Sequence, residues 1–139
     1  MSLGDSGTRR EARERALALL YEAETKQMGP EELLDSLPVV PAPFADELVR
    51  GVAEHAAELD ELIAAGSTDW RLERMPAVDR NILRLAVYEF LHEIDVPKLV
   101  IVDEAIELAK KFGSEDSGRF VNGLLDGLLK KRAFPGVMS

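Results

Sequence analysis

Apolar side chains recur at helical spacing along nearly the whole sequence, and glycine or proline interrupts this pattern repeatedly. Residues at positions i, i+3 and i+4 lie on one face of an α-helix, so each uninterrupted segment predicts one amphipathic helix. We find no convincing alternation of period two and no internal repeat, which argues against half-buried strands and repeat folds. The chain is therefore predicted to be all-α, with about seven helices.

The interruptions define the expected helices and their grouping. The helices are expected over residues 9–28, 30–37, 44–65, 70–75, 76–94, 98–112 and 115–132. The sequence GSTD at 66–69 favours a hinge, which predicts an N-terminal half over 8–66 and a C-terminal half over 67–132. We expect these two small bundles to pack into one compact domain. Residues 1–7 are expected to be a disordered leader, and residues 133–139 a frayed tail.

The charge balance limits the function. The chain has 17 Lys and Arg against 26 Asp and Glu, a formal net charge of −9. Non-specific nucleic-acid affinity comes from neutralising phosphates, so nucleic-acid binding would need a local basic patch. An acidic surface suits a basic protein partner. The sequence has no cysteine, no apolar run as long as a membrane span and no signal-peptide pattern, which is compatible with a cytoplasmic protein without membrane association.

A basic patch begins the first expected helix. Four arginines occupy its first two turns: Arg9, Arg10, Arg13 and Arg15. Thr8 and Glu11 have the spacing of a capping box, which predicts where the helix starts. Cations are disfavoured at a helix N-terminus, so their placement is unusual. It fits either a solvated face, partly offset by Glu11 and Glu14, or a patch that contacts phosphates.

The segment 110–127 departs most from ordinary helix-forming sequence. Gly113 predicts the end of one helix, and three residues of capping type predict the start of the next: Ser114, Asp116 and Ser117. Asn122 and Gly123 then lie early in the new helix, where glycine costs about 1 kcal/mol relative to alanine. We expect Gly123 to allow close approach of another helix, and the Asn122 amide to be buried.

No combination of residues indicates catalysis. The sequence GSEDSG at 113–118 lacks the lysine and the preceding strand of a P-loop. No serine lies in a nucleophile elbow, and carboxylates on helices are usually solvated. We therefore expect a protein that is not an enzyme and that needs no cofactor and no metal.

Four segments carry a resemblance to a known family. They are RREARERALALLYE at 9–22, WRLERMPAVDRNILRLAVYE at 70–89, DVPKLVIVDEAIELAKKFG at 95–113 and SEDSGRFVNGLLD at 114–126. These segments resemble the NusB family of bacterial transcription antitermination factors, and the last two are the most specific. The resemblance implies an all-helical fold of two small bundles.

The resemblance also implies a function and partners. NusB-like proteins pair with NusE, which is also a ribosomal protein of the small subunit, and the pair binds the boxA element of ribosomal RNA leaders. With NusA and NusG, the pair helps RNA polymerase to read through terminators. NusB-like proteins are monomers or homodimers, and a dimer that covers the arginine-rich helix would compete with RNA.

By position, the resemblance implies which residues bind. The RNA-binding residues would be Arg9, Arg10, Arg13 and Tyr21 in the first helix and Lys110, Phe112, Asp116, Ser117 and Phe120 at the later corner. Arginines would neutralise phosphates and the aromatic rings would stack on unpaired bases. Glu11 stands where the family often has a basic residue, which thins the patch. Glu73 and Asp79 would contact NusE.

Two other functions remain open from the sequence. A helical adaptor that binds only protein would not need the arginines. A NusB-like domain also begins some ribosomal RNA cytosine methyltransferases, in which case this chain would be their RNA-binding part.

Overall fold

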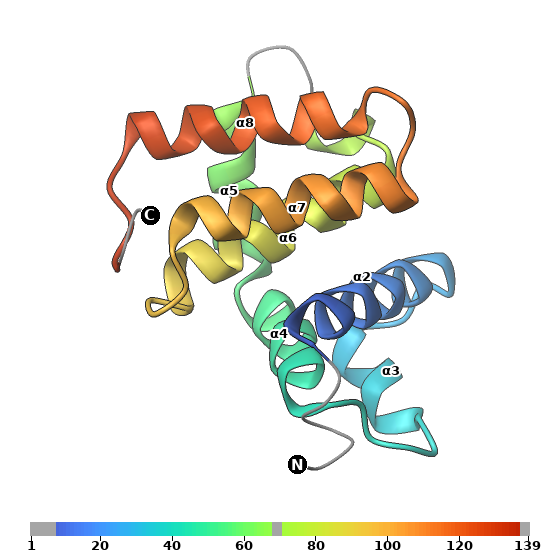
Figure 1. Cartoon of the computed structure of the whole chain (residues 1–139). Helices are drawn as coiled ribbons and strands as arrows, with labels where there is room; N and C mark the ends of the chain where they lie inside the picture. The colour runs from blue at the N-terminus through green and yellow to red at the C-terminus, as the bar shows by residue number, and fades with distance from the viewer. Residues whose placement is uncertain (1–7, 68–70, 137–139) are drawn as a thin grey trace. The chain divides into compact units, whose positions relative to one another are not determined.

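The computed structural model describes residues 8–67 and 71–136, which form helices and connecting turns. The helices are α2 (Arg9–Thr25), α3 (Pro30–Ser36), α4 (Pro43–Glu54), α5 (Ala56–Gly66), the 3-10 helix η1 (Leu72–Arg74), α6 (Ala77–His92), α7 (Lys98–Phe112) and α8 (Ser117–Lys131) (Figure 1). The described residues thus contain seven α-helices and no strand, which confirms the all-α prediction. None of their helices is long and apolar enough to span a membrane.

The chain divides into two compact units, Met1–His55 and Ala56–Ser139. The sequence predicted the division after Gly66, from the hinge pattern at 66–69, and it predicted one helix over 44–65. That helix is instead two. His55 follows α4 with φ −108° and ψ 19°, and α5 begins at Ala56. Neither glycine nor proline marks the break, so no local signal shows it. The predicted leader over residues 1–7 and Trp70, the first residue of the helix predicted over 70–75, lie outside the described residues.

In the first unit, α2, α3 and α4 pack on one another. The predicted capping box begins α2, because Thr8 Oγ1 accepts from the Glu11 amide and Glu11 Oε1 accepts from the Thr8 amide, both at 3.0 Å. Arg50 of α4 donates to Asp46 on its own helix at 3.1 Å and to Asp35 of α3 at 3.1 Å. These charge-assisted bonds tie α3 to α4.

In the second unit, α6 contacts α5, α7 and α8, and α7 and α8 run side by side as a hairpin (Figure 1). α5 also packs on α8, and Gly66 lies at that contact. A Cβ atom at Gly66 would approach the Leu128 side chain to 2.8 Å, so the absence of a side chain lets the two helices come together.

The chain after α8 is not frayed where the structure describes it. Phe134 is buried, and its ring lies 5.1 Å from that of Phe90 between centroids. Gly136 has φ +95° and passes so close to the Ile94 carbonyl that a side chain would collide with it. The predicted tail over 133–139 therefore packs on the second unit over 133–136, because Phe134 has an apolar surface to cover.

Candidate functional site

The turn between α7 and α8 is built around Gly113 and Ser117. A Cβ atom at Gly113 would lie 2.5 Å from Ser117 Oγ and 2.8 Å from the Ala109 carbonyl oxygen. Only glycine leaves room for the serine side chain to fold over the turn. The prediction of a helix stop at Gly113 is confirmed, and the physical reason is this close approach.

The Ser117 hydroxyl is a hydrogen-bonding centre inside the second unit. Its Oγ lies 2.7 Å from Asp79 Oδ1, 2.9 Å from the Ser114 amide and 3.2 Å from Ser114 Oγ. A carboxylate accepts only, so the single hydroxyl proton of Ser117 goes to Asp79 and Ser114 donates to Ser117. Ser117 and Asp79 are 1% and 4% exposed. Ser117, which was predicted to bind RNA, and Asp79, which was predicted to contact NusE, are therefore hydrogen-bonded to each other in the interior of the second unit.

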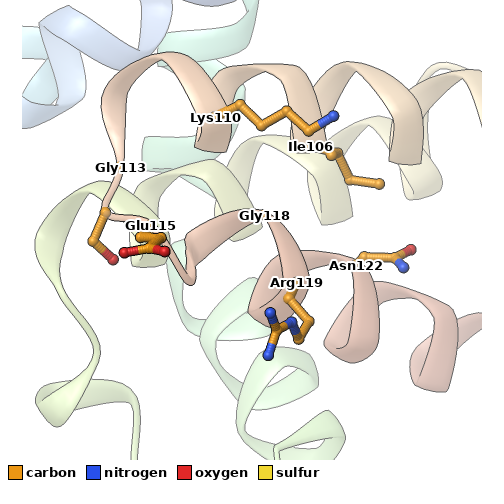
Figure 2. A pocket seen from close by; sticks show the side chains of 8 residues that line it. Ile106, Lys110, Gly113, Glu115, Gly118, Arg119 and Asn122 are labelled. Carbon is orange, nitrogen blue, oxygen red and sulfur yellow. The ribbon is translucent and has the colours of Figure 1, made fainter.

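A pocket of about 500 Å³ lies on the α7–α8 side of this turn. Its lining residues are Ile106, Lys110, Gly113, Ser114, Glu115, Gly118, Arg119 and Asn122 (Figure 2). Lys110 extends along α7 toward Ile106, whereas the Arg119 guanidinium points away from Lys110, so the two cations do not converge. The carboxylate of Glu115 further weakens any attraction of this pocket for anions.

The same region corrects two expectations about α8. Asn122 is exposed and lines the pocket, so its amide is not buried as predicted. A Cβ atom at Gly123 would have no neighbour within 4 Å in the described structure, so no helix approaches there. Gly66, at the end of another helix, is a glycine that does allow close helix packing.

A second pocket, of about 320 Å³, lies on the α6 side of the turn. Its lining residues are Met75, Pro76, Asp79, Ser114, Asp116, Ser117 and Phe120. Phe120 is half-buried and Asp116 is exposed. We call this the Phe120 pocket. Its apolar walls and one unburied carboxylate can accommodate a flat, apolar-faced group with a hydrogen-bonding edge.

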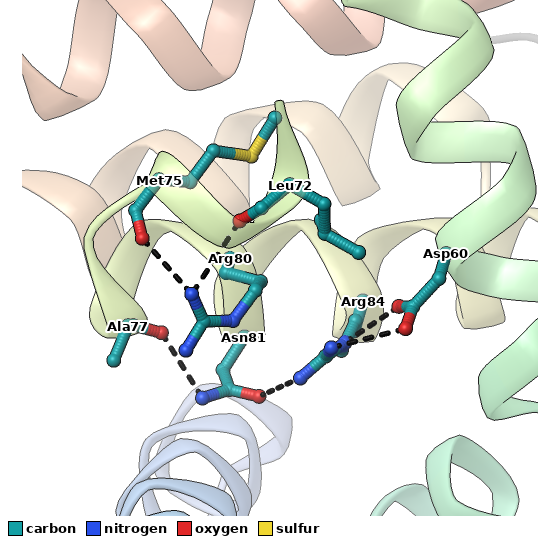
Figure 3. Close-up of polar contacts among 7 residues, drawn as sticks. All are labelled: Asp60, Leu72, Met75, Ala77, Arg80, Asn81 and Arg84. Atoms are coloured by element: carbon teal, nitrogen blue, oxygen red, sulfur yellow. Dashed lines mark hydrogen bonds and ion pairs between the residues drawn. The ribbon is translucent and has the colours of Figure 1, made fainter. Parts of the chain in front are cut away.

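A polar network holds the backbone at Met75, one of the residues that line the Phe120 pocket. Arg80 Nη1 donates to the Met75 carbonyl at 3.0 Å and to the Leu72 carbonyl at 3.4 Å, which ties the η1 turn to α6 (Figure 3). Two further residues of α6 extend the network. Asn81 accepts a hydrogen bond from Arg84 at 3.1 Å, and Arg84 binds Asp60 of α5 through two bonds of 2.7 and 3.1 Å.

The sequence did not identify Met75 and Pro76 as residues of the Phe120 pocket, because neither has a polar side chain that would indicate a binding site.

The other residues predicted at the corner lie on the surface. Phe112 is the last residue of α7 and is 44% exposed, and the Lys111 ammonium lies 5.4 Å from its ring centre. Lys110 is exposed, and its ammonium is 3.9 Å from Glu107. Four of the predicted residues are therefore accessible to a ligand: Phe112, Lys110, Asp116 and part of Phe120. Ser117 is buried and is not accessible.

The predicted residues of α2 lie in the first unit. Arg9 and Arg10 are exposed, and Arg13 is 4% exposed. Tyr21 is 46% exposed and lies about three turns after Arg10 on the same helix face. The guanidinium of Arg9 lies 4.2 Å from the ring centre of Phe44, and that of Arg13 lies 5.5 Å from it. Phe44 was not among the predicted residues.

The predicted partner residues differ in accessibility. Glu73 is exposed on η1, where a partner can reach it. Asp79 begins α6 but is buried against Ser117. An acidic residue in the first turn of a helix is stabilised by the helix dipole, which adds to the structural role of Asp79.

Comparison with known proteins identifies the family. The model of the NusB family matches residues 10–130. The chain belongs to the NusB family. The transcription antitermination protein NusB of Elusimicrobium minutum is 48% identical, over 91% of this chain and 96% of that protein. The NusB protein of Anaeromyxobacter dehalogenans is 51% identical, over 85% of this chain and 87% of that protein.

Solved structures give the same result. NusB of T. maritima matches with a TM-score of 0.82 and 39% identity, over 91% of this chain and 93% of that chain. A structure of antitermination factors NusB and NusE in complex with dsRNA matches with a TM-score of 0.75 and 27% identity, over 89% and 97% of the two chains. The prediction of a NusB-family protein that is not an enzyme is therefore confirmed.

Proposed function

We propose that this NusB-family protein is a transcription antitermination factor that binds boxA-type RNA together with NusE. The observation that carries the proposal is the Phe120 pocket, an apolar pocket with an exposed carboxylate beside a half-buried ring. The relatives named as transcription antitermination proteins, and the similar NusB of a complex with NusE and dsRNA, support it.

In this proposal the bases and the phosphates of the RNA are bound by different residues. An unpaired base enters the Phe120 pocket and stacks on the ring, and Asp116 accepts a hydrogen bond from an amino group of the base. Phe112 offers a second exposed ring at the end of α7. Arg9 and Arg10 neutralise phosphates, which adds affinity without sequence preference. Tyr21, on the face of Arg10, offers a further ring for stacking.

The proposed protein partner is NusE. Complementary charge speeds association, and the net charge of −9 suits a basic ribosomal protein. Glu73 is the accessible predicted contact. Asp79 supports the partner surface indirectly, since its bond to Ser117 holds the start of α6 against the α7–α8 turn.

The complex with NusE and RNA acts, in this proposal, on cytoplasmic RNA polymerase together with NusA and NusG. We also propose that any homodimer forms through the arginine-rich start of α2 and competes with RNA. Light scattering with and without boxA-type RNA tests the last point, because a dimer that retains bound RNA contradicts it.

The first experiment is a titration of fluorescent boxA-type RNA with the protein, alone and with purified NusE, at two salt concentrations. A scrambled RNA tests sequence preference. Phe120→Ala is expected to weaken binding about five- to 150-fold, the range for loss of one stacked base. Leu99→Ala is the matched control, because Leu99 is 49% exposed on the same unit but lies at the other end of α7.

Three results distinguish the functions. Selective binding that NusE strengthens, and that salt and Phe120→Ala weaken, supports the antitermination factor. Binding to NusE without any effect of RNA indicates a protein adaptor. RNA binding that is indifferent to NusE favours the RNA-binding domain of a methyltransferase, and binding to neither partner overturns the proposal.

A further inference from the structure

The pocket of about 500 Å³ between α7 and α8 borders the same turn as the Phe120 pocket, and Ser114 lines both. We call it the Asn122 groove. Two residues from each helix form its walls: Ile106 and Lys110 of α7, and Gly118 and Asn122 of α8 (Figure 2). Its volume lies within the range of small-ligand sites, so it has room for a nucleobase.

The Asn122 groove is open because residue 118 has no side chain. A Cβ atom at Gly118 would lie 3.6 Å from Lys110 Cγ and 3.8 Å from Ile106 Cγ2, which is ordinary van der Waals contact. Alanine would therefore fit at this position, and it is the better helix former. Packing of α7 on α8 does not require glycine here, whereas an open groove does, because a longer side chain would fill it.

The chemistry of the groove suits a flat, neutral group better than a phosphate. The charged groups of Lys110 and Arg119 point apart, and the Glu115 carboxylate opposes an anion. The Lys110 ammonium also lies 3.9 Å from the Glu107 carboxylate. The half-buried Ile106 side chain and the methylene chain of Lys110 provide an apolar surface. A base can lie on this surface while its phosphate stays in solvent.

Asn122 provides the hydrogen-bonding edge of the groove. Its side chain is exposed, and no residue of the described ranges 8–67 and 71–136 is hydrogen-bonded to its amide. Figure 2 shows this amide projecting from α8 at the end of the groove where Ile106 lies. A carboxamide presents an acceptor beside a donor, which matches the amino group of adenine and the ring nitrogen next to it.

Adenine fits such an amide better than the other RNA bases do. An unpaired base is read on its Watson–Crick or its Hoogsteen edge. Adenine presents a donor beside an acceptor on both edges, whereas the Hoogsteen edge of guanine presents two acceptors. Adenine can therefore pair with Asn122 in two orientations, and its larger ring system covers more of the apolar surface than a pyrimidine does.

We propose that the Asn122 groove is a second base subsite, which binds an unpaired adenine next to the nucleotide in the Phe120 pocket. Because Ser114 lines both pockets, a single strand that crosses the turn can place neighbouring bases in them. The inference rests on the proposed RNA-binding function. It adds Ile106, Gly118 and Asn122 to the site and makes Asn122 the residue that determines the preferred base.

The test is a titration, in the presence of NusE, of boxA-type RNAs that carry each of the four bases at one position at a time. The position whose base preference is lost in Phe120→Ala is the nucleotide in the Phe120 pocket. At one of its two neighbours, replacing adenine should weaken binding to the unmodified protein about five- to 150-fold, the range for one bidentate contact. In Asn122→Ala the same replacement should have almost no effect. A loss of stability cannot imitate this result, because it would weaken binding to all four RNAs alike.

Two leucine substitutions in α8 separate a filled groove from a damaged helix. Gly118→Leu places a side chain in the groove, so it should weaken binding at least as much as Asn122→Ala does. Gly123→Leu is the matched control, because Gly123 does not line the groove and a Cβ atom there would meet no described neighbour. It should bind RNA as the unmodified protein does. Thermal unfolding checks that both variants fold, as expected for leucine in place of glycine in a helix.

The negative results have different meanings. The second subsite is overturned if the unmodified protein prefers adenine at neither neighbouring position, if the preference persists in Asn122→Ala, or if Gly118→Leu binds RNA with full affinity. Each of these results leaves RNA binding itself intact. Failure of the unmodified protein to bind RNA with or without NusE overturns the proposed function instead.

Discussion

The hydroxyl of Ser117 donates a 2.7 Å hydrogen bond to the carboxylate of Asp79, 38 residues earlier in the chain. The bond joins the first turn of α8 to the first turn of α6, and both side chains are buried. Asp79 and Ser117 also line the Phe120 pocket. The bond therefore stabilises the fold and shapes the pocket at once.

Ser117→Ala should lower the free energy of unfolding by about 1 to 3 kcal/mol, because it leaves the buried Asp79 carboxylate without this donor. Urea denaturation measures the change. Ser114→Ala is the matched control, since Ser114 is exposed and should matter less. Asp79→Asn keeps an acceptor for Ser117, so it should cost less than Asp79→Ala. Equal stability of Ser117→Ala and the unmodified protein would show that the bond contributes nothing.

Two glycines should respond in opposite directions to alanine. At Gly66 the new methyl group would lie 2.8 Å from buried Leu128, and such overpacking typically costs about 1 to 3 kcal/mol. At Gly123, inside α8, the described structure leaves open space, so alanine should stabilise by about 0.5 to 1 kcal/mol. Thermal unfolding of the two variants measures both changes, and a loss of stability at Gly123 would contradict the open space.

Lys98→Met should stabilise the protein by about 1 to 3 kcal/mol near neutral pH, because it removes an unsatisfied buried group. Lys98 is 0% exposed, and its Nζ atom has no hydrogen-bond partner among residues 8–67 and 71–136. Burial lowers the pKa of this ammonium below its ordinary value of 10.5. Urea denaturation of the two proteins measures the difference in free energy of unfolding.

The pH dependence of this difference has a definite sign. Between the lowered pKa of the folded state and about 10.5, the unfolded chain binds more protons at Lys98 than the folded chain does, so the contribution of Lys98 to stability becomes more favourable as pH rises. The advantage of Lys98→Met should therefore shrink as the pH rises from the lowered pKa of the folded state toward about 10.5. An advantage that grows with pH would exclude desolvation as the cause.

Gln27→Gly should stabilise the end of α2 by about 0.5 to 1 kcal/mol. Gln27 has φ 57°, the left-handed conformation that glycine adopts without steric cost, and the Met28 amide beyond it donates to the Ala23 carbonyl at 2.8 Å. Gln27→Ala retains the Cβ atom and should give no such gain. Thermal unfolding compares the two variants, and an equal effect of both would point to the lost side chain rather than to the backbone.

Part of the candidate site followed from the sequence, and part did not. Arg9, Phe112 and Asp116 were predicted to contact RNA; all three are exposed, and their contact with RNA stays a prediction. The contact of Phe44 with Arg9 and Arg13 was not visible, because an aromatic residue at a helix start has the same sequence pattern whether or not arginines pack on it. The burial of Asp79 against Ser117 was not visible for a similar reason, since an acidic residue at a helix start usually faces solvent.

The sequence by itself determined the helical class, most helix ends and the family. Helical spacing, the Thr8–Glu11 capping box and the stop at Gly113 are local properties, written within a few neighbouring residues. Only the tertiary structure decided the break at His55, the buried bond between Ser117 and Asp79, and which glycine allows close packing. These features depend on which distant surfaces meet, and burial of apolar surface against them outweighs the local preference of any one residue.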